Sequence, residues 1–206
     1  MGTDYFYTID KQSEGIYTEK SSKFLAFAFH VISENEVKQH LNELKKKYFD
    51  ARHQVYAFII GKNQEIYRAS DDGEPTNSSG PPVLGQIRSM NLTNTLIVVV
   101  RYFGGTKLGV PGLINAYKTA AKNALDNAKI IKKYIENKLE IIFDYEDVNF
   151  VMKVLKDYEA NIKSQTFQEN CSIICTIKLS LYEKILKTLK QNHKLIIKEY
   201  DNENIC

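Results

Sequence analysis

Apolar residues follow different patterns in the two parts of the chain. In the first 130 residues, the β-branched run Ile97–Val100 predicts a strand buried on both faces. Ser33 and Glu36 form the capping-box pattern that begins a helix. Further apolar segments predict strands at 24–29, 54–60 and 66–69, and helical spacing predicts helices at 33–48, 81–90 and about 113–128.

From residue 131 on, the pattern predicts a small second domain. Its strands and helices are expected in the order strand 139–145, helix 148–158, strands 161–168 and 171–179, helix 182–191 and strand 195–200. This βαββαβ order is that of the ferredoxin-like arrangement. The chain is therefore predicted to be an α+β protein with an N-terminal βαβ-type domain at 1–130 and a ferredoxin-like domain at 131–206.

Composition and charge narrow the partners only slightly. The net charge of +3 is too small to imply nucleic acid by itself. Lysine is far commoner than arginine, and all four arginines fall between positions 52 and 101. Since arginine offers a planar, bidentate fork that lysine lacks, this clustering indicates a recognition surface.

The N-terminus and the cysteines bear on location and metal binding. The first ten residues show neither a basic segment nor an apolar core typical of a secretory signal, and no apolar run reaches membrane-spanning length. We therefore expect a cytoplasmic protein without a membrane partner. As zinc ligands, Cys171 and Cys175 would need two more partners, and His193 with Cys206 are the only nearby candidates in the sequence, so we expect packing cysteines and no metal.

Four glycines gather just after the apolar run and Arg101, and they predict a loop whose backbone conformation matters. They match neither the Walker A pattern nor the dinucleotide fingerprint, because Val110 and Pro111 follow Gly109. No cofactor is therefore expected. Binding of a backbone phosphate by the amides at the start of the following helix stays open.

An acidic turn at 70–75 is the second candidate. Asp71, Asp72 and Glu74 offer hard oxygen ligands for a divalent cation, but their spacing is not that of a calcium loop. The favoured interpretation is a turn whose carboxylates cap amides or pair with Arg68 and Arg101. His53 could act as a general base only beside a nucleophile, and no serine lies in a Gly-x-Ser-x-Gly nucleophile elbow. No catalytic residue is therefore assigned.

Three segments carry a resemblance to a known family: DARHQVYAFIIG at 50–61, SDDGEP at 70–75 and VVVRYFGGTKLGVPGLINAY at 98–117. Together they resemble the bacterial YigZ branch of the IMPACT family. The resemblance implies an N-terminal domain similar to domain IV of elongation factor G and a C-terminal domain similar to its domain V. It also implies a role in translation control, with RNA or ribosome binding and no established reaction.

The chain departs from the family pattern in both loops. Asn77-Ser78-Ser79-Gly80 stands where Gly-Thr-Ala-Gly is usual, and Val110-Pro111 replaces a Thr/Ala-Gly pair. Both changes reduce backbone freedom or the number of amide donors. The charged residues of the two loops are nevertheless present.

The leading hypothesis is a translation-associated regulator that binds RNA or the ribosome and catalyses no reaction. A protein-interaction module engaging a regulatory partner and a metal-dependent hydrolase at the acidic turn are the alternatives. A monomer is favoured, although the sequence does not fix the oligomeric state. The predicted binding residues are Arg52, His53, Arg68, Asp71, Asp72, Glu74, Arg101, Tyr102, Phe103, Gly104, Gly105, Lys107 and Gly109.

Overall fold

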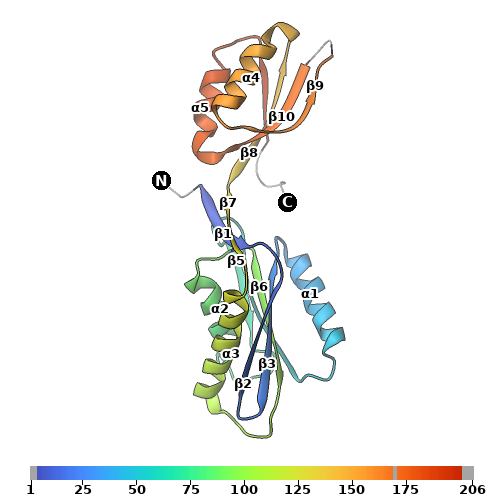
Figure 1. The fold of residues 1–206 in the computed structure, drawn as a ribbon, viewed down its shortest axis with the longest axis vertical. Helices are drawn as coiled ribbons and strands as arrows, with labels where there is room; N and C mark the ends of the chain where they lie inside the picture. The colour runs from blue at the N-terminus through green and yellow to red at the C-terminus, as the bar shows by residue number, and fades with distance from the viewer. Residues whose placement is uncertain (1–3, 169–170, 201–206) are drawn as a thin grey trace. The chain divides into compact units, whose positions relative to one another are not determined.

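The computed structural model describes residues 4–168 and 171–200 and divides the chain into two compact units. The first unit is Phe6–Lys133, and the second runs from Tyr134 on and includes the N-terminal segment up to Tyr5. The division thus falls after Lys133, whereas the sequence pattern suggests residue 130. The units are described separately below (Figure 1).

The first unit is built on a five-stranded sheet whose neighbouring strands are all antiparallel. β3 and β4 flank β6 and run in the same direction, and α1 joins them, so they form a βαβ unit split by β6. The four strands predicted in this part of the chain are confirmed. The sheet order is β2 (Ser13–Glu19), β3 (Ser22–His30), β6 (Thr95–Tyr102), β4 (His53–Ile60) and β5 (Ile66–Ser70).

Helices cover both faces of this sheet (Figure 1). α1 (Glu34–Lys47) packs on one face, and α2 (Gly80–Ser89) and α3 (Gly109–Asp126) pack on the other. β6 is consequently buried from Thr95 through Arg101, and the prediction of a strand buried on both faces is confirmed. The two-sided helix cover, and not a parallel sheet, is the physical reason for the continuous apolar run.

The helix starts follow local chemistry. The Ser33 hydroxyl accepts a hydrogen bond from the Glu36 amide at 3.3 Å, and the Glu36 carboxylate accepts one from the Ile32 amide at 2.8 Å, so the predicted N-terminal cap of α1 is confirmed. The predicted start of α3 near Leu113 is wrong by about one turn, because the helix begins at Gly109. Pro111 lies in this first turn, where its missing N–H forfeits no helical hydrogen bond.

A two-stranded sheet pairs β1 (Tyr5–Ile9) with β7 (Ile130–Tyr134). The sequence pattern predicts neither strand. Both are short, and both carry polar or charged residues among their apolar ones.

The second unit has the predicted element order and mixed α/β composition. Its sheet runs β11-β8-β10-β9 with antiparallel neighbours throughout, and its two long helices pack on one face (Figure 1). The elements are β8 (Glu136–Phe143), a 3-10 turn (Tyr145–Asp147), α4 (Val148–Asp157), β9 (Asn161–Thr166), β10 (Cys171–Lys178), α5 (Leu179–Leu189) and β11 (Ile196–Tyr200).

The cysteines of β10 belong to the core of the second unit. Cys171 and Cys175 are fully buried on the face that the helices cover, and burial raises the pKa of the Cys175 thiol to about 12. Both therefore behave as packing residues. Cys206 lies outside the described residues. Within residues 4–168 and 171–200, no helix is both long and apolar enough to cross a bilayer.

Candidate functional site

A buried ion pair lies where β6 ends. Strand alternation places Arg101 on the face that α2 and α3 cover, and only 8% of its side chain is exposed. Its Nη1 donates to the Glu74 Oε1 at 2.6 Å, and the Tyr117 hydroxyl donates to the same oxygen at 2.7 Å. The acidic turn, the central strand and α3 are thereby joined at one carboxylate, and this offsets the desolvation of the two charges.

Aromatic rings complete the surroundings of Arg101. Its guanidinium lies 5.5 Å from the ring centre of Phe24 and 5.6 Å from that of Phe103. Burial, followed by the hydrogen bond to Glu74, raises the pKa of Tyr117 far above its usual range, so Tyr117 stays a protonated donor. The Arg101 Nε is buried without a hydrogen-bond partner in the described part of the chain.

A pocket of about 440 Å³, here called the Arg101 pocket, opens above this pair. Glu74 and Arg101 line its interior. Arg52, His53 and Lys107 contribute polar groups, and its walls are mainly apolar: Pro75, Phe103, Leu108, Val110 and Leu113.

Two of the pocket's cations are available to a ligand. Arg52 and Lys107 are exposed, and neither forms an ion pair within residues 4–168 and 171–200. The N-terminus of α3 also reaches the pocket at Gly109 and Val110, and a helix N-terminus carries partial positive charge. The pocket thus combines mainly apolar walls with exposed positive charge.

Asp71 organises the acidic turn. Its Oδ1 accepts hydrogen bonds from the Ser79 hydroxyl and from the amides of Ser79 and Gly80, and its Oδ2 accepts one from the Asn77 amide, at 2.7–3.0 Å. Burial alone would raise the pKa of Asp71, but these hydrogen bonds outweigh it and hold the pKa below its usual value. Asp71 therefore caps the start of α2.

Asp72 and His53 are linked on the other side of the turn. His53 Nδ1 lies 2.8 Å from the Asp72 carbonyl oxygen and donates to it, because a carbonyl oxygen can only accept. In the neutral imidazole the proton is therefore on Nδ1, and Nε2 is an acceptor. The Asp72 carboxylate accepts from the Gln54 amide at 2.6 Å. The three acidic side chains of the turn thus face different partners, and the described residues hold no group of three or more ligands suited to a metal ion.

The glycine loop follows from close packing and from backbone conformation. A Cβ on Gly104 would lie 2.0 Å from the Ser21 carbonyl carbon, and the Gly104 amide donates to the Ser22 hydroxyl at 3.1 Å. Gly105 has φ +89° with open space around it. Gly104 therefore lets the loop pack against the β2–β3 turn, and Gly105 supplies the bend that follows.

Six predicted binding residues do not line the Arg101 pocket: Arg68, Asp71, Asp72, Tyr102, Gly104 and Gly105. Tyr102 points to the α1 face of the sheet, where its hydroxyl donates to Asp50 at 2.8 Å, and this bond raises its pKa. Arg68 is exposed on β5, opposite Phe58 of the α1-side core. Asp72 lines a second pocket.

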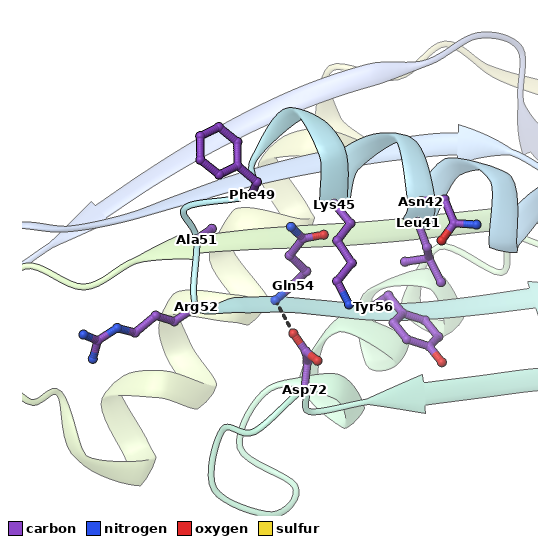
Figure 2. Close-up of a pocket in the computed structure, with 9 residues that line it drawn as sticks. All are labelled: Leu41, Asn42, Lys45, Phe49, Ala51, Arg52, Gln54, Tyr56 and Asp72. Carbon is purple, nitrogen blue, oxygen red and sulfur yellow. Dashed lines mark hydrogen bonds between the residues drawn. The ribbon is translucent and has the colours of Figure 1, made fainter.

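That second pocket lies between α1 and the start of β4 (Figure 2). It also measures about 440 Å³ and contains Leu41, Lys45, Gln54 and Tyr56. Arg52 lines both pockets, and in Figure 2 its side chain extends away from Lys45 and Tyr56.

Tyr117 and Phe24 belong to the site but were not among the predicted residues. A tyrosine on the buried face of a helix usually finds a hydrogen-bond partner, and that rule is the signal by which Tyr117 could have been found. Phe24 carries no such signal, because an apolar strand residue looks the same beside any core. Arg101, a predicted binding residue, lies in the buried ion pair: its Nη1 donates to Glu74, and its side chain is nearly inaccessible from outside.

Comparisons with known proteins place this site in a family. A family model described as the Impact N-terminal domain matches residues 20–125, more than half of the chain. A Bacillus subtilis protein described as IMPACT family member YvyE is 30% identical over 165 residues, which cover 80% of this chain and 76% of the relative. The chain belongs to the IMPACT family. This assignment confirms the resemblance drawn from the three sequence segments.

One further relative extends the family assignment over most of the chain, and one solved structure shares the fold. An IMPACT family member of Haemophilus influenzae is 30% identical over 182 residues, which cover 86% of this chain and 88% of the relative. A crystal structure described as that of a hypothetical protein matches with a TM-score of 0.71 at 21% identity, over 98% of this chain and all of that one. In this IMPACT member, the Arg101 pocket falls wholly within the matched Impact domain.

Proposed function

We propose that this protein is a translation-associated regulator that binds RNA or the ribosome through the rim of the Arg101 pocket, and that it catalyses no reaction. The observation that carries the proposal is that two cations without ion-pair partners in the described residues, Arg52 and Lys107, line a mainly apolar pocket in the Impact domain. Cations of this kind neutralise phosphates, and an exposed aromatic beside them suits unpaired bases. The family resemblance supplies the link to translation.

The acidic turn supports a binding role, because its carboxylates are engaged within the protein. Glu74 is paired with Arg101, and Asp71 faces backbone amides. Two serines that follow the turn are engaged as well, since Ser78 donates to the Pro75 carbonyl and Ser79 to Asp71. Neither hydroxyl is directed at His53, which argues against a serine nucleophile with a histidine base.

The proposal is tested by filter binding of the full chain to ribosomal RNA at low and at moderate ionic strength. We expect binding to weaken steeply with salt, and Lys107→Gln and Arg52→Gln each to lower the log–log salt slope by about one. Arg68→Gln is the matched control, since it removes an exposed arginine from the edge strand. Salt-insensitive binding, or equal loss in all three variants, would refute the proposed face.

A protein partner is the second candidate, and exposed apolar side chains favour it. Phe103, Val110 and Ile114 are 50%, 46% and 38% exposed and come from the glycine loop and the first turns of α3. Such side chains anchor protein interfaces when they cluster. A pull-down from nuclease-treated lysate that retains a protein on the parent chain, and loses it on Val110→Ser, would support this candidate.

A further inference from the structure

We infer that the Arg101 pocket receives one unpaired base of a single-stranded RNA segment, with Arg52 and Lys107 on the flanking phosphates and with little selection among the bases. This inference rests on the proposed RNA-binding function and names the ligand group that the pocket takes. Duplex RNA, whose bases are stacked and paired, would contact only the rim.

The shape and walls of the pocket suit a flat apolar group. Its volume of about 440 Å³ exceeds that of one base, and apolar side chains form most of its walls. Phe103 is half exposed even though its ring lies beside the Arg101 guanidinium. The ring therefore has open surface on which a base can stack, as aromatic side chains do in single-strand binding proteins.

Charge favours a base that carries phosphates over a neutral apolar ligand. Arg52 and Lys107 lie at the pocket without ion-pair partners in the described part of the chain. Glu74 does not oppose them, because its side chain is 4% exposed and bound to Arg101 and Tyr117. The acidic residue nearest the ligand is thus neutralised within the protein.

The interior of the pocket gives little basis for distinguishing bases. Glu74 Oε1 and Arg101 Nη1 are already bonded to each other, which leaves few groups for reading a base edge. Arg101 Nε is buried, so it is not exposed to a base edge either. Stacking, which every base can provide, is then the main contribution of the base.

The test compares two fluorescein-labelled octamers of equal charge by anisotropy at one ionic strength: oligouridine, and a ribose-phosphate chain without bases. We expect the parent protein to bind the octamer with bases roughly ten-fold more tightly. Phe103→Ala should remove this difference and leave affinity for the baseless chain unchanged, and Phe103→Tyr should restore it. Lys107→Gln should weaken both complexes equally. Oligoadenosine and oligocytidine should bind within a few-fold of oligouridine.

Phe167→Ala is the matched control, since it truncates an exposed phenylalanine of the second unit, and thermal melting verifies that each variant is folded. Equal binding of the two octamers, or a Phe103→Ala variant that keeps the preference, would overturn the inference. If ribosomal RNA still bound in a salt-dependent way, the proposed function would stand. Absence of binding to any RNA, with a protein retained after nuclease treatment, would overturn both.

Discussion

Both units of this protein have exposed ion pairs, but among the described residues only the first unit also has a fully buried one. In the second unit, Lys178 and Glu159 pair at 2.8 Å with 31% and 72% of their side chains exposed, and Lys198 and Glu140 pair in the same manner. In the first unit, the Arg101–Glu74 pair is 8% and 4% exposed. Exposed pairs are solvated and screened, whereas a buried pair must compensate for lost hydration through geometry.

The comparison indicates what the buried pair does. Glu74 comes from the acidic turn, Arg101 from β6 and Tyr117 from α3, so a single carboxylate fixes three segments at the interior of the pocket. The second unit has an apolar core with helices on one face of its sheet, and that core contains no ion pair among the described residues. We interpret the buried pair as the device that shapes the Arg101 pocket, while Arg52 and Lys107 stay exposed beside it.

The largest expected effect comes from breaking the buried pair. Glu74→Ala should lower the free energy of unfolding of the first unit by about 3–5 kcal/mol, because it leaves the Arg101 charge buried and unpaired. Urea denaturation followed by circular dichroism measures the change. The triple replacement Glu74→Leu, Arg101→Met and Tyr117→Phe removes all three polar groups together and should recover most of the loss. If the Glu74→Ala variant were as stable as the parent, this role of the buried pair would be contradicted.

A smaller effect isolates the third member of the cluster. Tyr117→Phe removes only the hydroxyl that donates to Glu74 at 2.7 Å and leaves the ring packed against Phe24. We expect a loss of about 1.5–3 kcal/mol, the usual contribution of a hydrogen bond to a charged group. The same urea titration serves. In the Glu74→Ala background the substitution should cost much less, and additive losses would show that the hydroxyl does not act through Glu74.

Much of the fold could be predicted from the sequence because periodicity reports burial directly. The central strand carries an unbroken apolar run since it is covered on both faces, and the cap of α1 is encoded by Ser33 and Glu36. β1 and β7 could not be predicted, because both are short and they pair with each other across more than a hundred residues of sequence. Long-range pairing of this kind leaves no local pattern.

The sequence identified the loops that form the candidate site, but not which of their side chains lie together in the pocket. The interpretation of the acidic turn as a capping and pairing element holds for Asp71 and for Glu74 with Arg101, whereas Arg68 lies on the edge strand. Arg101 and Tyr102 are neighbours in the sequence, but strand alternation places their side chains on opposite faces of the sheet. Sequence proximity cannot show which of two neighbours reaches the pocket unless the buried face is known.

Asp71 gives a pH-dependent test within the first unit. Its pKa is lowered in the folded state, so its contribution is fully present above its ordinary value of 3.8 and is lost as pH falls through the lowered folded value. Asp71→Asn should cost about 1–2 kcal/mol near neutral pH, the usual range for a lost helix cap. Urea midpoints measured from pH 7 to pH 2.5 should fall less steeply in this variant. Parallel acid profiles would contradict the role of the carboxylate.

The smallest effect is expected in the second unit and completes the comparison. Glu159→Ala breaks the pair with Lys178, whose Nζ lies 2.8 Å from the carboxylate. Their hydrogen bond is the main reason why the pKa of Glu159 is lowered and the pKa of Lys178 is raised. Both groups stay in contact with water when the pair is lost, so the urea midpoint should match that of the parent within error.

Glu159 also has φ +52°, where a glycine is easier to place than an alanine, and Glu159→Gly is therefore the second variant. If Glu159→Ala destabilised the protein as strongly as Glu74→Ala does, burial would not be what separates the two ion pairs.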